Sequence, residues 1–196
     1  MVELEKLFKT GEPARDKFLS RLFGIFNEEA VRCWAACEKA PYENLGRPTV
    51  SEREEERGST LDFSLRSRLD GKVFVAEMKC ELEYENYKYL RLTSPTQLLH
   101  HSKPAFNLFL KAATNPKDVA VRINGRPISI TGSILVWGAV ADNARQAVQE
   151  RFKFHRILSL EEILEDLLNW RDERWLSFVS SRRDWAIALF DALAPY

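Results

Sequence analysis

The chain has 196 residues with 29 basic and 29 acidic side chains, so its formal net charge is zero. This balance excludes a protein that coats nucleic acid through a strong overall positive field, although it leaves room for a local basic groove. Hydrophobic residues make up 45% of the chain, and its longest apolar runs fall short of the roughly 20 residues that a membrane helix needs. We therefore expect one globular domain over residues 1–196 and no membrane span.

The start of the chain and the cysteines both favour a cytoplasmic protein. The first residues, MVELEKLFKTGEP, lack the basic start and continuous apolar stretch of a secretory signal. The three cysteines give no even-numbered disulfide framework, and Cys33 and Cys37 lie one helical turn apart on an apolar stripe, where buried thiols are common. We do not expect a zinc site, because a closed one needs four ligands in paired spacings.

A long helix is expected over residues 14–40, because apolar residues recur there at three- and four-residue spacings and Pro41 follows. The residues of that stripe are Phe18, Leu22, Ile25, Phe26, Cys33 and Ala36. Glu29 falls inside the apolar arc, whereas Glu28 points outside it. Glu29 either has a role in the interior or reaches water from the edge of the stripe.

A β-hairpin is expected over residues 59–84. Its first arm alternates apolar and polar residues, and Asp70-Gly71 is a strong signal for a two-residue turn. Such a turn would place Asp62 opposite Lys79, with Glu77 diagonal to Asp62 on the same face. A loop longer by one residue would reverse the parity and separate these side chains.

The second arm of this hairpin, VFVAEMKC at 73–80, is apolar on both faces before Glu77 and Lys79 appear. Removing a carboxylate or an ammonium from water is costly unless a partner or a metal compensates. The placement therefore indicates a functional pair. The alternative is a strand that emerges into solvent with a loose acid and base at its end.

The rest of the chain predicts alternating helices and strands. A helix start is expected at Ser94, Pro95 and Gln97, with Pro104 kinking or dividing that helix. The remaining expected elements are a hairpin turning at Asn124-Gly125, a central strand at 133–140, a short strand and a helix capped by Ser159 within 152–170, and an amphipathic helix at 175–193.

With Asp62 on one arm and, after 14 intervening residues, Glu77-Met78-Lys79 on the other, the chain resembles the PD-(D/E)XK nuclease superfamily. The resemblance covers about residues 14–140 and leaves 141–196 as a helical C-terminal extension. It implies an α/β, restriction-endonuclease-like fold with a central mixed β-sheet flanked by helices. Leu61 stands where the motif has proline.

The resemblance implies a divalent-metal-dependent endonuclease that hydrolyses phosphodiester bonds, with DNA favoured over RNA. Mg²⁺, for which Mn²⁺ can substitute, would be held by Asp62, Glu77 and the backbone carbonyl of Met78. Lys79 would orient or deprotonate the attacking water and stabilise charge on the phosphate. Glu29 matches the glutamate that many members place on the first helix, as a further metal ligand.

Basic residues and tyrosines alternate around the motif, which predicts either a nucleic-acid-binding groove or an ordinary solvated charged surface. The candidate basic contacts are Arg66, Arg68, Lys88 and Arg91, and the tyrosines are Tyr84, Tyr87 and Tyr89. Gln97 matches a glutamine that some members place on the next helix, although its capping-box position explains it more simply. The acidic residues Glu81, Glu83 and Glu85 would repel phosphate unless they face away.

Two further expectations concern assembly and activity. Cleavage of both strands of a duplex usually needs two sites, which is compatible with a homodimer, although no residue pattern in the sequence indicates one. The alternative to an enzyme is a noncatalytic module that uses the same fold to bind nucleic acid or protein. The complete Asp62, Glu77 and Lys79 set favours catalysis, because a module without that chemistry has little reason to keep charges beside a packed strand.

Overall fold

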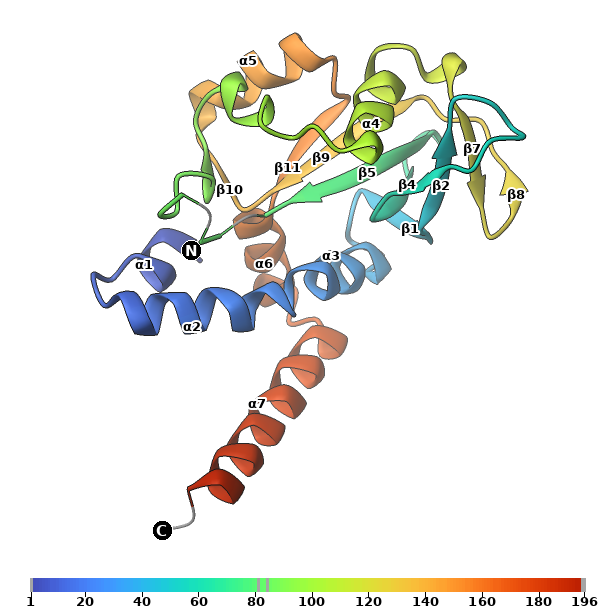
Figure 1. Ribbon diagram of the computed structural model, residues 1–196. Helices are drawn as coiled ribbons and strands as arrows, with labels where there is room; N and C mark the ends of the chain where they lie inside the picture. The colour runs from blue at the N-terminus through green and yellow to red at the C-terminus, as the bar shows by residue number, and fades with distance from the viewer. Residues whose placement is uncertain (1, 81, 84, 195–196) are drawn as a thin grey trace.

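The computed structural model describes residues 2–80, 82–83 and 85–194 and is built around a five-stranded mixed sheet of order β1-β4-β5-β9-β11 (Figure 1). The first three strands are antiparallel, and β9 and β11 run parallel to β5. Their bounds are Tyr42–Gly46 (β1), Phe63–Ser67 (β4), Val73–Lys79 (β5), Gly132–Trp137 (β9) and Arg156–Ser159 (β11). The expected α/β class with a mixed central sheet is confirmed, and β9 is the buried central strand that the sequence predicted.

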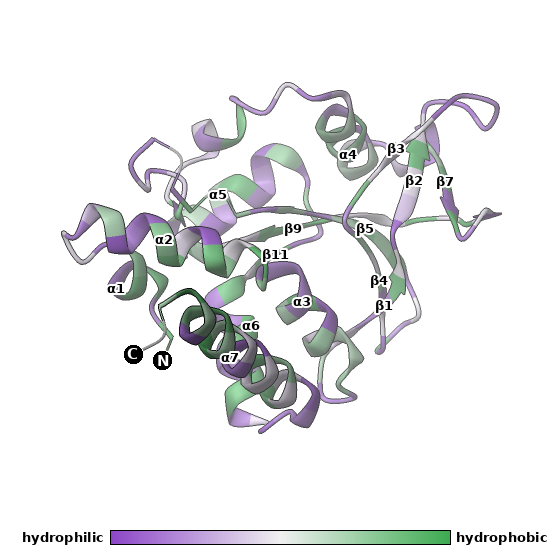
Figure 2. Cartoon of the chain, turned by 60° about the horizontal axis from the view of Figure 1, so that its bottom comes forward, coloured by the Kyte–Doolittle hydropathy of each residue, from purple (hydrophilic) through white to green (hydrophobic). Residues whose placement is uncertain are grey.

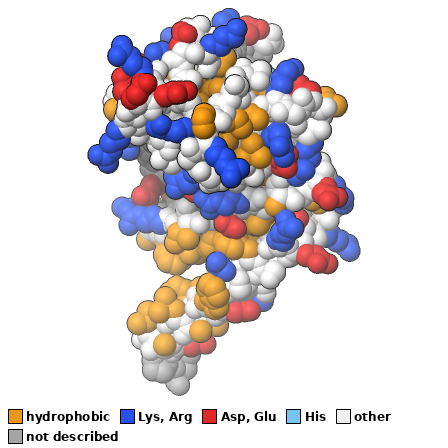
Figure 3. Space-filling model, turned by 90° about the vertical axis from the view of Figure 1, so that its right-hand side faces the viewer, with side chains coloured by type: hydrophobic (Ala, Val, Ile, Leu, Met, Phe, Trp, Pro, Cys, Tyr) orange, Lys and Arg blue, Asp and Glu red, His pale blue; other side chains and the backbone are white. Residues whose placement is uncertain are grey.

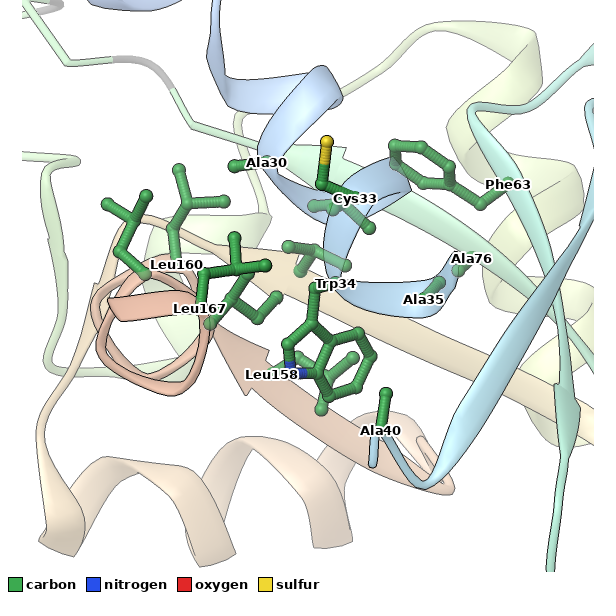
Figure 4. Packing of buried hydrophobic residues seen from close by; sticks show 14 of the residues in the cluster. Ala30, Cys33, Trp34, Ala35, Ala40, Phe63, Ala76, Leu158, Leu160 and Leu167 are labelled. Atoms are coloured by element: carbon green, nitrogen blue, oxygen red, sulfur yellow. The ribbon is translucent and has the colours of Figure 1, made fainter. Parts of the chain in front are cut away.

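Helices cover both faces of this sheet, because successive residues of the buried strands point to opposite sides. Phe74 and Ala76 of β5 pack into one apolar cluster, whereas Val75 packs into the other. The first cluster lies under α3, Asn27–Ala36, and α6, Leu160–Asn169, as Figure 4 shows. The second lies under α4, Pro104–Thr114, and α5, Asp142–Phe152. The first cluster also includes side chains of α1, Leu4–Phe8.

The single helix expected over residues 14–40 is two helices, α2 (Pro13–Gly24) and α3. Gly24, a poor helix former, ends the first. The buried side chains of α2 are Asp16 and Ser20, whereas Phe18 and Ile25, assigned to the core stripe from the sequence, are 51% and 71% exposed. The apolar residues keep helical spacing across the break, so the sequence did not reveal that two separate helices bury different sides there.

A second, four-stranded sheet of order β3-β2-β7-β8 lies beside the central sheet. Its strands are Pro48–Ser51 (β2), Ser59–Thr60 (β3), Ala120–Ile123 (β7) and Arg126–Pro127 (β8). The chain passes between the two sheets at Arg47, after β1, and again at Leu61 and Asp62, before β4. The Leu61 N–H donates to the Pro48 carbonyl at 3.0 Å, so the two crossings lie next to each other.

Two of the predicted local structures form as expected. Asn124 and Gly125 both adopt positive φ, +51° and +77°, and connect β7 to β8 as a two-residue turn. Ser94 caps a short 3₁₀ helix, η1 (Pro95–Leu98), and Pro104 begins the separate helix α4. The remaining short elements are a 3₁₀ helix at Pro116–Asp118 and a two-stranded parallel ladder of β6 (Arg91–Leu92) with β10 (Ala139–Val140).

The segment after residue 141 contributes to the sheet as well as adding helices. Its strand β11 is the edge strand beside β9, and Ser159 then begins α6, where Glu162 accepts a hydrogen bond from the Ser159 N–H at 3.4 Å. The last helix, α7 (Glu173–Leu193), extends away from the body (Figure 1). Within the described ranges, no helix has the length and apolar character to cross a membrane.

Candidate active site

The β4–β5 hairpin places Asp62 beside Glu77. Phe63 faces Ala76 across the two strands, so Asp62, the residue before Phe63, comes next to Glu77. The prediction that Asp62 faces Lys79 is therefore wrong by two residues. The predicted common face holds, because a shift of two keeps the parity of the strand.

The turn chemistry explains the shift. The Ser67 N–H donates to the Lys72 carbonyl at 2.8 Å, so residues 68–71 form a four-residue loop. A two-residue type I′ turn needs positive φ at both central residues. Gly71 has φ +72°, but Asp70 is not among the described residues with positive φ. The Asp-Gly pair therefore ends a longer loop.

Glu77 and Lys79 lie on the face of the sheet that packs under α4. In the β9 register, Glu77 is next to Leu135 and Lys79 is next to Trp137, both fully or almost fully buried. The side chain of Glu77 is 8% exposed and that of Lys79 is 18% exposed. The predicted placement of this acid and base beside a packed apolar wall is confirmed, and the alternative of a strand end in open solvent does not hold.

Each charged group of the site has a specific contact. The Lys79 Nζ donates to Glu77 Oε1 at 2.6 Å, and the Met78 N–H donates to Asp62 Oδ2 at 2.9 Å. Lys79 Nζ also lies 5.5 Å from the ring centre of Phe106 on α4. Glu77 Oε2 is buried and has no hydrogen-bond partner among the described residues. Oε2 is thus the less well satisfied of the two Glu77 oxygens, although the backbone N–H of Asp62 is close enough to lower the pKa of this carboxyl.

The electrostatics of the site disfavour two negative charges without a cation. Burial raises the pKa of Glu77, and the neighbouring Asp62 carboxylate raises it further, while the ion pair with Lys79 acts in the opposite direction. Two carboxylates side by side in a poorly solvated place repel each other. A bound cation would relieve that repulsion, as the ammonium of Lys79 already does in part.

Arg47 is part of the site, although nothing in the sequence singled it out. Its Nη2 lies 3.6 Å from Asp62 Oδ1, and its side chain is 54% exposed. Arg47 reaches Asp62 because both residues occupy crossings between the two sheets. Arg47 could have been found only by predicting the two short strands on either side of it. The polar segment around it did not indicate either strand.

The donor set fits a hard cation. Asp62 and Glu77 offer carboxylate oxygens, which Mg²⁺ and Mn²⁺ accept. The Met78 N–H points toward Asp62, and in an extended strand the carbonyl of a residue points to the same side as its N–H. Two side chains and one backbone carbonyl are therefore available. No group of three or more His, Cys, Asp or Glu side chains suited to a metal occurs in the described part of the chain.

Glu29, predicted as a further metal ligand, lies on α3, which packs on the opposite face of the central sheet. Its carboxylate pairs with Arg32, three residues later on the same helix, at 3.2 Å, and its side chain is 35% exposed. No interaction found among the described residues joins it to Asp62 or Glu77. The arrangement matches the alternative of a glutamate at the edge of the stripe that reaches water.

The four predicted basic contacts do not form one groove with the site. Arg66 and Arg68 lie at the loop end of the β4–β5 hairpin, away from Asp62, and both contact Glu43 on β1. The other two also pair with carboxylates: Lys88 with Glu85 at 2.7 Å and Arg91 with Glu5 at 2.7 Å. Their charges are largely matched within the chain.

Gln97 is a structural residue and not a groove contact. It is 6% exposed, and its Oε1 accepts hydrogen bonds from the backbone N–H groups of Thr93 and Ser94 at 2.6 and 3.0 Å. Its Nε2 donates to the carbonyls of Lys88 and Arg91. The capping-box explanation is therefore confirmed. Two other residues of the predicted groove region, Glu81 and Tyr84, lie outside the described residues.

The chain was also compared with known protein families, curated proteins and solved structures. No protein-family model matches the chain, and neither a curated protein nor a solved structure matches it. The structure brings Asp62, Glu77 and Lys79 together on one face of the central sheet.

Proposed function

We propose that the protein is a divalent-metal-dependent nuclease that hydrolyses phosphodiester bonds, with DNA as the favoured substrate, on a restriction-endonuclease-like fold. The observation that carries the proposal is the pair of adjacent carboxylates, Asp62 and Glu77, on two central strands, with Lys79 on the same face. A buried acidic pair costs stability unless a ligand uses it. The unpartnered Glu77 Oε2 supports this use.

In this proposal Asp62, Glu77 and the Met78 carbonyl hold Mg²⁺, or Mn²⁺ in its place. When bound there, the ion would polarise the phosphate and make a coordinated water more acidic. Lys79 is held by Glu77 and by the aromatic face of Phe106, which fixes the direction of its ammonium group. From that position Lys79 orients the attacking water and stabilises the developing negative charge.

Arg47 adds a substrate-binding group to this site. A guanidinium can bind a phosphate through two parallel hydrogen bonds, which a single ammonium cannot do. Its side chain is 54% exposed and lies beside Asp62, so the guanidinium can reach both solvent and the carboxylate pair. We expect Arg47 to hold the phosphate next to the scissile bond and to contribute to substrate affinity.

Cleavage by the wild type and by Lys79→Ala tests the proposal. Single-stranded, double-stranded and branched DNA and RNA are incubated with each protein in Mg²⁺, in Mn²⁺ and in chelator. We expect metal-dependent cleavage that falls about a hundredfold or more in Lys79→Ala, the usual scale for loss of a general base or a preorganised charge. Lys72→Ala, at an exposed lysine in the β4–β5 loop that pairs with Asp70, is the control and should cut normally.

The second candidate function is a noncatalytic binding module. The observation that favours it is the internal matching of the site charges, since Glu77 pairs with Lys79 and Asp62 lies near Arg47. Such a module would bind nucleic acid or protein without Mg²⁺-stimulated cleavage. In the same assay, an inactive wild type, or equal cleavage by the wild type and Lys79→Ala, would contradict the nuclease mechanism.

A further inference from the structure

The helix α7 exposes more apolar surface than a helix on the surface of a protein normally does. Figure 2 shows hydrophobic residues along this helix, and Figure 3 shows hydrophobic side chains gathered on its surface. Seven of its large apolar side chains are between 44% and 72% exposed: Leu176, Val179, Trp185, Ile187, Leu189, Phe190 and Leu193. A surface helix usually keeps its apolar residues on the face toward the core. Contiguous apolar surface of this kind marks an interaction site.

Only the first part of α7 is packed firmly on the body. Trp175 is buried, and the ring of Phe178 lies edge-on to Phe26, with their centres 5.7 Å apart. Further along, Phe190 approaches Phe18 of α2 at 6.4 Å. Between the two helices an apolar groove of about 410 Å³ remains open. Its walls include Leu22, Phe23 and Phe26 on one side and Val179, Ala186 and Phe190 on the other.

A row of α7 residues, four of which line the groove, has the spacing of a helix-pairing seam. Its residues follow each other at intervals of three and four, as in the a and d positions of a heptad repeat. They are Leu176, Val179, Arg183, Ala186, Phe190 and Leu193. Arg182, which also lines the groove, lies 4.3 Å from the ring centres of both Phe178 and Trp185 and covers part of the neighbouring side of the helix. Leu176, Val179, Phe190 and Leu193 of the seam remain at least 44% exposed, so this face is left for a partner.

The charge of α7 argues for a protein partner over a lipid surface. The helix has three basic residues, Arg174, Arg182 and Arg183, and three acidic ones. Helices that bind anionic membranes instead have an excess of Lys and Arg on their polar face. Because the helix is neutral, as the whole chain is, two copies can approach without net repulsion.

The available area also suits a second copy. Half-exposed side chains of this size offer roughly 100 Å² each. The exposed apolar side chains on the seam, next to it and on α2 are Leu176, Val179, Ile187, Phe190, Leu193, Phe18 and Ile25. Together they offer roughly 700 Å², close to the roughly 800 Å² per partner of a standard stable interface.

We propose that the protein forms a homodimer through α7, with the two copies of the helix antiparallel in the grooves beside α2. Antiparallel pairing of the seam brings Leu176 against Leu193 of the partner subunit and Val179 against Phe190 of the partner subunit. Arg183 then faces the small Ala186 of the partner subunit and keeps its 3.1 Å ion pair with Asp184. This inference does not depend on the proposed nuclease activity.

Substitutions at two adjacent residues test whether dimerisation depends on the seam or on other exposed residues of α7. Phe190 and Leu189 are 52% and 56% exposed, but only Phe190 belongs to the seam. We expect the wild type to sediment as a dimer at micromolar concentration, Phe190→Asp to sediment as a monomer, and Leu189→Asp to remain dimeric. Circular dichroism should show the same helix content in all three. A monomeric wild type, or equal dimerisation of both variants, would overturn the proposal.

Cross-linking tests the antiparallel register. Leu176→Cys combined with Leu193→Cys should give a disulfide-linked dimer on mild oxidation, whereas the wild type with its native cysteines should not. The two positions lie about 25 Å apart along one helix, so the bond cannot form within a chain. No cross-link in the double variant would overturn this register. Binding of the wild type to phosphatidylcholine–phosphatidylserine vesicles that is lost in Phe190→Asp would replace the dimer with a membrane surface.

Discussion

Strand β5 and helix α7 depart from the usual distribution of side chains in opposite directions. β5 places the charged groups of Glu77 and Lys79 against an apolar wall, where the whole Glu77 residue, backbone included, is only 6% exposed. α7 leaves Trp185 and Leu193 62% and 72% exposed to water. Each arrangement costs free energy in the isolated chain, through desolvation in the first case and exposed apolar surface in the second.

The two proposals differ in the kind of ligand that each region would take. The β5 site lies between neighbouring strands of the central sheet, and a carboxylate oxygen of Glu77 is one of its buried groups without a hydrogen bond among the described residues. A small, hard cation suits such an oxygen. The α7 surface is broad and apolar, and only a macromolecular surface of similar size can cover it. The two regions therefore make separate predictions.

The largest expected effect on stability comes from the cation. Mn²⁺ at a hundred times its dissociation constant should raise the free energy of unfolding of the wild type by about 2.7 kcal/mol, because it binds only the folded site. Glu77→Gln removes the buried anionic oxygens and should lose this stabilisation. Thermal unfolding with and without Mn²⁺ measures the effect. An equal shift in Glu77→Gln would place the ion elsewhere.

A smaller effect is expected when Asp62 is removed without metal. Asp62→Ala loses the hydrogen bond from the Met78 N–H, worth about 1 kcal/mol, but it also removes the repulsion with Glu77. The free energy of unfolding should therefore change by no more than about 1 kcal/mol. Leu65→Ala, at a fully buried position of β4, should cost about 2–5 kcal/mol and is the reference. A comparable loss in Asp62→Ala, measured by urea unfolding, would make Asp62 a structural residue.

The last prediction concerns how fast the thiol of Cys33 reacts, which reports on the packing of the start of α7 and needs no substitution. Burial raises the pKa of this thiol to about 11, with Glu29 and Asp172 adding to the effect. At pH 8 it should have about a hundredfold less thiolate than a cysteine with a pKa of 9.0. We expect Cys33 to react correspondingly slowly with a thiol reagent, as followed by mass spectrometry. Rapid labelling would show that the first turns of α7 detach from α3.

The sequence predicted the parts of the fold that local chemistry determines. Asn124-Gly125 turned as expected because both residues accept positive φ. The parity of Asp62 and Glu77 survived an error in the loop, since parity depends only on whether the loop length is even or odd. The capping role of Gln97 followed from its spacing to Ser94.

The sequence did not predict the contacts between distant segments, because no local pattern of residues encodes them. Arg47 joins the site through two chain crossings between sheets, and the strands at those crossings are only two to five residues long. The break between α2 and α3 was hidden because Phe18 and Ile25 continued the apolar period while facing away from the sheet. The partners of Arg66 and Arg91 come from distant segments, at Glu43 and Glu5.

The most direct test of the central claim is a crystal of the wild type soaked in Mn²⁺ and measured at a wavelength where manganese scatters anomalously. We expect an anomalous peak between the carboxylates of Asp62 and Glu77 and within ligand distance of the Met78 carbonyl. A fully soaked crystal with no peak there, and with Lys79 still paired to Glu77, would contradict the proposed metal site and the nuclease mechanism that depends on it.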